Sequence, residues 1–82
     1  MNKFHNLDLY NTVSSSLMIN KIGEELAEVV NAIINKDKEN IKEELCDLIQ
    51  CCYGLAYTMD IKIEDCIEKH NEKLLNRGHK FI

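Results

Sequence analysis

The sequence predicts an all-α protein, and three observations support this prediction. The 82-residue chain has no proline and only three glycines, so few residues interrupt a helix. Apolar residues recur with helical spacing, and almost no stretch shows the alternation of a strand. Polar residues and glycine divide the chain into two long helices and a shorter C-terminal helix.

The first long helix is expected to run from Thr12 or Ser14 to about Asn35. Its apolar stripe contains Met18, Ile22, Leu26, Val29 and Ile33. The residues before this helix predict either a short helix or an arm. Asp37 is a plausible N-cap for a second helix that runs to about Thr58. This helix is expected to bury Ile41, Leu45, Leu48, Ile49, Cys52, Leu55, Ala56 and Met59.

A last helix is predicted from about Ile63 to Asn76, with Gly78 in the position that commonly ends a helix. The short connection between the two long helices predicts an antiparallel hairpin. No linker or repeat divides the chain, so we expect one domain over residues 1–82. The predicted architecture is therefore a helical hairpin plus a C-terminal helix, assembled by oligomerisation into a core of the four-helix-bundle type.

Composition limits the class of protein. No apolar run approaches the ~20 residues that span a bilayer, and no signal sequence is evident. Four cysteines without zinc-finger spacing are expected to be reduced, buried apolar residues of a cytoplasmic protein. The net charge is −4, and without the two acidic motifs described next nine acids face ten bases. A nucleic-acid or membrane partner is therefore not expected.

Two acidic motifs dominate the chain, Glu24–Glu28 and Glu44–Asp47. Within each motif the acids lie three or four residues apart, beside the apolar stripe of a helix. An antiparallel hairpin brings the second motif opposite Glu25 and Glu28, so that four or five carboxylates converge. Like charges placed so closely predict a bound cation, and carboxylates without histidine favour Mg²⁺, with Mn²⁺ as a substitute. Lys21 lies within the same helical arc.

The last helix carries a basic stripe of Lys69, Lys73 and Arg77, spaced four residues apart and suited to phosphate oxygens. Asn71 adds an amide for a base, a sugar or a phosphate. The alternative interpretation of the acidic motifs and of the basic stripe is an ordinary solvated helix surface.

Together these motifs resemble the MazG family of all-α nucleoside triphosphate pyrophosphohydrolases, over about Lys21 to Arg77. The resemblance implies Mg²⁺-dependent cleavage of a ribo- or deoxyribonucleoside triphosphate into its monophosphate and pyrophosphate. It also implies a homodimer or homotetramer. Carried over to this sequence, the metal ligands are Glu25, Glu28, Glu44 and Asp47. Glu24 is then a further ligand or the base that orients water, and the residues near the triphosphate are Lys21, Lys69, Asn71, Lys73 and Arg77.

Three alternatives remain open. Lys21 followed by Gly23-Glu24-Glu25 also resembles the related phosphoribosyl-ATP pyrophosphatases of histidine synthesis, although the Lys-x-Asn-x-Lys-x-x-x-Arg ending favours the MazG-like branch. A non-catalytic helical dimerisation or regulatory module would use the acids only for solubility. A di-iron carboxylate bundle would require Glu-x-x-His pairs, which neither acidic motif contains.

Overall fold

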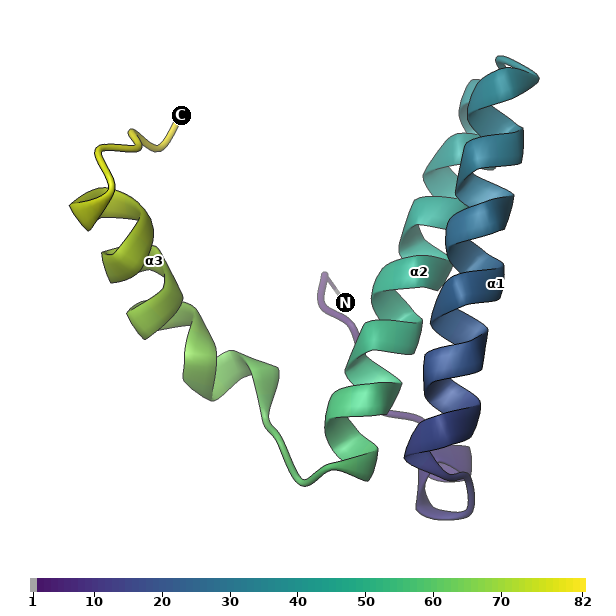
Figure 1. Ribbon diagram of the computed structural model, residues 1–82, viewed down its shortest axis with the longest axis horizontal. Coiled ribbons are helices and arrows are strands. Elements are labelled where there is room, and N and C mark those ends of the chain that lie inside the picture. The colour runs from purple at the N-terminus through teal and green to yellow at the C-terminus, as the bar shows by residue number, and fades with distance from the viewer. Residues whose placement is uncertain (1) are drawn as a thin grey trace.

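The computed structural model describes residues 2–82, whose regular elements are all helices, with no strand. The order of elements is the 3₁₀-helix η1 (Asp8–Asn11), α1 (Ser15–Ile34), α2 (Lys38–Thr58), the 3₁₀-helix η2 (Ile63–Cys66) and α3 (Ile67–Asn76). Helices α1 and α2 form an antiparallel hairpin (Figure 1). The all-α fold predicted from the sequence is therefore confirmed.

Side-chain hydrogen bonds cap the N-termini of both long helices, close to where the sequence predicted that these helices begin. The Ser14 hydroxyl accepts a hydrogen bond from the Leu17 amide at 3.1 Å, and the Asp37 carboxylate accepts one from the Asn40 amide at 3.2 Å. Both bonds satisfy amides that the helix itself leaves unpaired. The tight turn between the helices places Lys36 at φ 57°, a left-handed conformation. These contacts fix where α1 and α2 begin and where the chain turns between them.

The buried core is small and lies between α1 and α2, with Tyr10 of the N-terminal segment covering one end of it. Its apolar members are Tyr10, Met18, Val29, Ala32 and Ala56. The Tyr10 hydroxyl donates to the Gln50 carbonyl oxygen at 3.1 Å and accepts from Gln50 Nε2 at 2.9 Å. Phe4 stacks on Tyr53 with ring centroids 5.5 Å apart. The N-terminal segment is therefore anchored on α2, as an arm that ends in η1.

Several residues that the sequence assigned to a buried stripe are exposed in the single chain. On α1, Leu26 and Ile33 are about half exposed, at 52% and 55%. On α2, the exposed members are Leu45, Ile49, Cys52 and Met59. The periodicity identifies the apolar face of each helix. A pair of helices, however, buries only the part of each apolar face that contacts the other helix, and the rest stays exposed. The prediction of buried cysteines is wrong for Cys46, Cys52 and Cys66, and Cys51 is half-buried.

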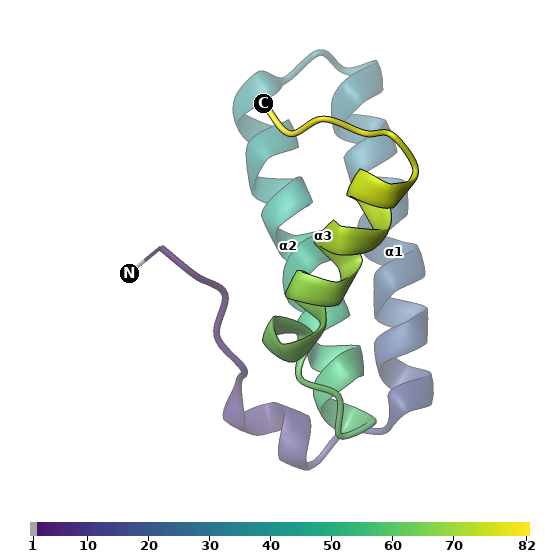
Figure 2. The same ribbon diagram turned by 90° about the vertical axis from the view of Figure 1, so that its left-hand side faces the viewer.

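The C-terminal helix differs from the prediction in its start and in its packing. It begins as η2 and becomes α-helical only at Ile67, and Gly78 follows it at φ 89°. Its main contacts with another helix are with η2, and it extends away from the hairpin (Figure 1). Turning the molecule by 90° places α3 in front of the hairpin (Figure 2). No helix within residues 2–82 has the length and apolar character needed to cross a membrane.

Candidate metal centre

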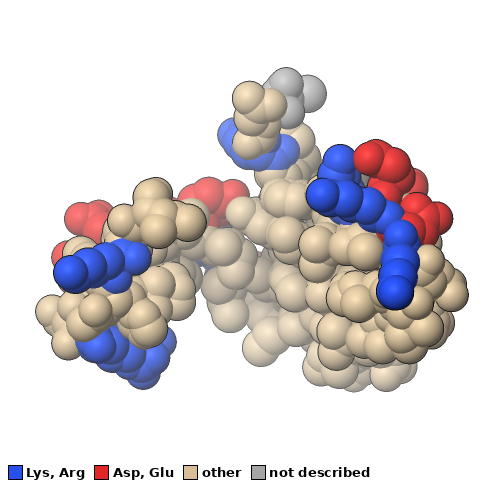
Figure 3. Space-filling model, turned by 90° about the horizontal axis from the view of Figure 1, so that it is seen from above, with Lys and Arg blue, Asp and Glu red and all other residues tan. Residues whose placement is uncertain are grey.

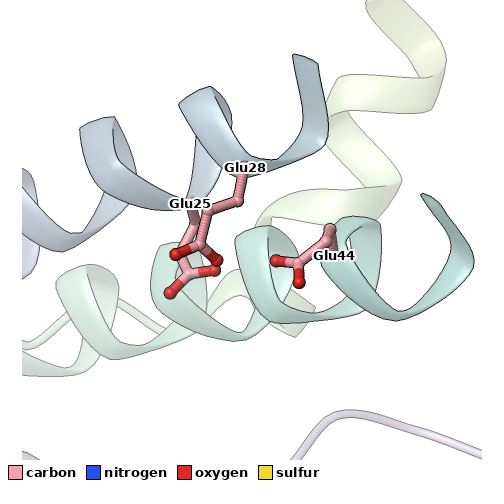
Figure 4. A group of neighbouring side chains, drawn as sticks. All are labelled: Glu25, Glu28 and Glu44. Carbon is pink, nitrogen blue, oxygen red and sulfur yellow. The ribbon is translucent and has the colours of Figure 1, made fainter. Parts of the chain in front are cut away.

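Three of the predicted metal ligands converge between α1 and α2. Glu25, Glu28 and Glu44 each contribute one carboxylate oxygen to a group in which all the oxygens lie within 4.8 Å of one another. We call these residues the carboxylate cluster. Figure 4 shows Glu25 and Glu28 reaching from α1 toward Glu44 on α2. The hairpin brings the two acidic motifs together as predicted, but three carboxylates of the described residues converge instead of the four or five expected.

Local helical geometry explains the convergence. Glu25 and Glu28 are three residues apart, so they lie on one face of α1 about one turn apart. The Asp37 cap starts α2 at Lys38, and the antiparallel direction then places Glu44 across from both. The cluster thus depends on the register of the hairpin rather than on any single contact.

The other residues of the acidic motifs lie outside this group. Asp47 is near enough that its charge raises the pKa of both Glu25 and Glu44, whereas the Lys21 charge opposes the shift at Glu25. Lys21, Glu25 and Asp47 also line one cavity together. Glu24 is exposed and does not belong to the group of converging oxygens. Asp47 therefore flanks the cluster, and Glu24 lies next to it on α1.

The electrostatics of the cluster favour a bound positive charge. A hydrogen bond with Glu28, partial burial and the nearby negative charges raise the pKa of Glu44 to about 7. Burial and the Glu28 carboxylate raise the pKa of Glu25. One oxygen of each residue, Oε2, is buried without a hydrogen-bond partner in the described part of the chain. Such orphaned oxygens are costly unless a proton or a cation neutralises them.

The donor set fits a hard divalent cation. Mg²⁺ binds oxygen ligands at roughly 2.0–2.1 Å and Ca²⁺ at roughly 2.3–2.6 Å, so two oxygens on one ion lie at most about 4 Å apart for Mg²⁺ and about 5 Å apart for Ca²⁺. The cluster oxygens lie within 4.8 Å of one another, so a small movement of the side chains brings them onto one Mg²⁺ ion. The absence of histidine and cysteine from the group argues against zinc. The cluster is therefore suited to Mg²⁺ or Mn²⁺.

The basic stripe lies elsewhere in the single chain. Lys69, Lys73 and Arg77 line one open concavity of α3, which they share with the exposed His70. Asn71 is half-buried and is not among the residues of this concavity. Seen from above, Lys and Arg side chains lie on the C-terminal part as well as on the hairpin (Figure 3). The stripe and the carboxylate cluster are not brought together within one copy of the chain.

One feature of the site was missed in the sequence. A cavity formed by the N-terminal segment and the hairpin adjoins Glu25 and Asp47. The sequence feature that points to this cavity is the group of apolar residues before α1. These residues predicted a short helix or an arm, but not the part of the hairpin that the arm would cover.

Comparison with known proteins found a matching family model and several curated relatives. The model of the family described as phosphoribosyl-ATP pyrophosphohydrolase matches residues 7–73. A protein of Clostridium acetobutylicum named phosphoribosyl-ATP pyrophosphatase is 38% identical over 63 residues, covering 73% of this chain and 57% of the relative. A protein of the same name from Bacillus cereus (strain B4264) is 38% identical over 66 residues, covering 77% and 62%. No solved structure matches the chain significantly.

These matches favour the phosphoribosyl-ATP pyrophosphatases over the MazG family, the two families that the sequence resembles. The chain spans between half and two thirds of the length of the curated relatives it matches. They carry the name of the alternative that the Lys21 and Gly23-Glu24-Glu25 pattern suggested, rather than that of the MazG-like branch. The Lys21 and Gly23-Glu24-Glu25 pattern, and not the basic C-terminal ending, therefore indicated the family that matches.

Proposed function

Because the chain belongs to the phosphoribosyl-ATP pyrophosphohydrolase family, we propose that it hydrolyses phosphoribosyl-ATP and releases pyrophosphate. Water adds to the α-phosphorus, the α–β anhydride bond breaks, and pyrophosphate leaves with the bonding electron pair. The observation that carries the proposal is the convergence of Glu25, Glu28 and Glu44 with two buried, unpartnered oxygens. A general (deoxy)nucleoside triphosphate pyrophosphohydrolase is the second candidate, favoured by the Lys-x-Asn-x-Lys-x-x-x-Arg ending.

The carboxylate cluster would hold Mg²⁺, or Mn²⁺ as a substitute, with Asp47 as a further ligand. A bound divalent ion lowers the pKa of coordinated water and neutralises phosphate oxygens. Without such a positive charge, the triphosphate would be repelled by the carboxylates. Glu25, Glu28 and Glu44 therefore position the charge that lets the triphosphate approach. Glu24, which adjoins this cluster on α1, is proposed to orient the attacking water.

Positively charged side chains would bind the substrate. Lys21 lies beside Glu25, so its ammonium group can contact a phosphate oxygen at the edge of the cluster. Lys69, Lys73 and Arg77, with Asn71, are proposed to contact the triphosphate from α3. Since α3 extends away from the cluster of its own chain, these contacts would come from a second copy in a homodimer or homotetramer.

A hydrolysis assay tests the proposal. The purified protein with Mg²⁺ is given phosphoribosyl-ATP, ATP and the deoxynucleoside triphosphates in turn, and pyrophosphate is measured. We expect release from phosphoribosyl-ATP above all others, and its loss in Glu28→Gln. Release mainly from unmodified nucleoside triphosphates would favour the second candidate. No release from any nucleotide would leave the non-catalytic helical module as the better interpretation.

A further inference from the structure

Lys21 is the only positively charged residue among those described around the cavity between the N-terminal segment and the hairpin. It shares this cavity with Glu25 of the carboxylate cluster and with Asp47, which flanks the cluster. On α1, Lys21 precedes Glu25 by four residues, so the two side chains lie on the same face of the helix, about one turn apart. Lys21 therefore lies at the edge of the carboxylate cluster.

The charge of Lys21 acts on groups of both helices of the hairpin. Burial raises the pKa of the Glu25 carboxyl on α1 and the pKa of the Cys51 thiol on α2, and the Lys21 ammonium group opposes both rises. Both of these groups line the cavity together with Lys21. The ammonium group is therefore close enough to the cavity to act on two of its walls.

Lys21 is not held in place by a direct ion pair. Within residues 2–82, the one ion pair closer than 4 Å joins Lys42 to Glu39 on the exposed surface of α2. Lys21 is itself exposed, and lysine carries a compact, strongly hydrated charge on a flexible four-carbon stem. Its ammonium group therefore neutralises part of the charge of the cluster from a distance and can still move.

This arrangement has opposite effects on the metal-free and the metal-bound states. The Oε2 atoms of Glu25 and Glu44 are buried without a hydrogen-bond partner in the described part of the chain. A nearby ammonium group lowers the electrostatic free energy of such carboxylates when no ion is bound. When a divalent ion binds, the same ammonium group repels it, because two positive charges then share one site. Lys21 thus stabilises the metal-free state and opposes binding of the ion.

We propose that Lys21 is an internal counter-ion of the carboxylate cluster, which competes with the divalent ion and so sets the affinity of the chain for it. The inference rests on the proposed function, because that function assigns the ion to the cluster. It also goes beyond that function, in which Lys21 is a contact of the substrate. In the metal-free protein the side chain replaces part of the positive charge that the ion supplies.

Three variants separate the charge of Lys21 from its packing. Lys21→Met removes the charge and keeps most of the length of the side chain, whereas Lys21→Arg keeps the charge. Lys42→Met is the matched control, because Lys42 is an exposed lysine of the hairpin that pairs with Glu39 outside the cavity. Isothermal titration calorimetry measures the dissociation constant for Mg²⁺. Circular dichroism measures the unfolding temperature of each metal-free chain at pH 8.

We expect Lys21→Met to bind Mg²⁺ about fivefold more tightly than the wild-type chain, the order expected when one exposed charge near the ion is removed. The same variant should unfold at a lower temperature without metal, because the cluster loses its counter-ion. Lys21→Arg and Lys42→Met should match the wild type in both measurements. A lower unfolding temperature with unchanged or weaker Mg²⁺ binding would assign Lys21 a purely structural role and overturn the inference.

The same measurements distinguish failure of this inference from failure of the proposed function. Equal Mg²⁺ affinity of all the variants, together with pyrophosphate release by the wild type, would overturn the inference and retain the proposed function. Tighter Mg²⁺ binding by Lys21→Met, with no pyrophosphate release from any nucleotide, would support the counter-ion and reject the proposed function. Absence of Mg²⁺ binding in every chain would overturn both the counter-ion and the metal assignment on which it rests.

Discussion

A Cβ atom on Gly54 would lie 2.7 Å from Cε1 of the Tyr10 ring. The same atom would lie 2.6 Å from Cε of Met18, so the α2 backbone is in close contact with both the N-terminal segment and α1. A glycine inside a helix often marks the close approach of another segment, and here Tyr10 and Met18 of the same chain make that approach. Gly54 therefore allows the Tyr10 ring to pack directly on α2.

Gly54→Ala should destabilise the fold despite the higher helix propensity of alanine. The added methyl group forces Tyr10 and Met18 to move, and overpacking of this kind costs about 1–3 kcal/mol. Urea unfolding followed by circular dichroism measures the change in the free energy of unfolding. Gly23→Ala is the matched control, because nothing lies within 4 Å of its added Cβ. That variant should be stabilised by up to about 1 kcal/mol. Equal effects of the two substitutions would show that Tyr10 does not pack on Gly54.

The hairpin was predictable because its signals are local. Helical periodicity, the Ser14 and Asp37 positions and the spacing of Glu25 and Glu28 each depend on residues within one or two turns. What the sequence did not reveal depends on contacts between distant segments. Tyr10 is 40 residues from Gln50, and neither residue forms part of a motif that predicts their hydrogen bonds. The exposure of Leu26 likewise depends on how many helices surround α1, which periodicity does not specify.

Metal-free protein should lose stability as the pH rises from about 4.5 to about 7. The pKa of Glu44 is raised from 4.5 to about 7 in the folded state, by Glu28, by burial and by Asp47 and Glu25. Across this interval the folded state retains a proton that the unfolded state has released, so the slope of stability against pH is negative. Thermal unfolding in EDTA between pH 5 and 8 measures it.

Glu44→Gln should flatten this dependence and raise the unfolding midpoint at pH 8. Glu43→Gln is the control, since Glu43 is exposed and adjacent in sequence but not part of the carboxylate cluster. A stability profile of Glu44→Gln that matches the wild type would mean that the cluster does not hold the proton.

Mg²⁺ should raise the unfolding temperature, because an ion that binds only the folded state stabilises it by mass action. At a concentration 100 times the dissociation constant, the gain is about 2.7 kcal/mol. Glu28→Gln or Asp47→Asn should remove this gain together with activity. Neither substitution should unfold the metal-free chain, because each relieves repulsion between like charges. Differential scanning fluorimetry with and without Mg²⁺ tests both statements, and full activity in both variants would refute the metal assignment.

Removal of the basic stripe should affect substrate but not metal. Lys73→Ala and Arg77→Ala are expected to raise KM or lower kcat while leaving the Mg²⁺-induced shift in unfolding temperature unchanged, because they lie on α3 rather than on the hairpin. Lys62→Ala, which removes an exposed lysine before η2, is the control. Wild-type kinetics in both stripe variants would identify the stripe as ordinary solvated surface.

The chain should form a homo-oligomer whose unfolding midpoint rises with protein concentration. Leu26, Val30 and Ile33 are each about half exposed, and they lie within about 60° of arc on α1. An 82-residue unit buries too little surface to leave such a stripe in water at no cost in stability. Ile33→Lys should therefore shift the assembly toward monomer in sedimentation velocity and lower the unfolding midpoint. Asn31→Lys adds the same charge to an exposed polar position on another face of α1, so it should change neither. A stable monomer of the wild-type chain at micromolar concentration would contradict the prediction. It would also remove the second copy from which α3 is proposed to reach the carboxylate cluster.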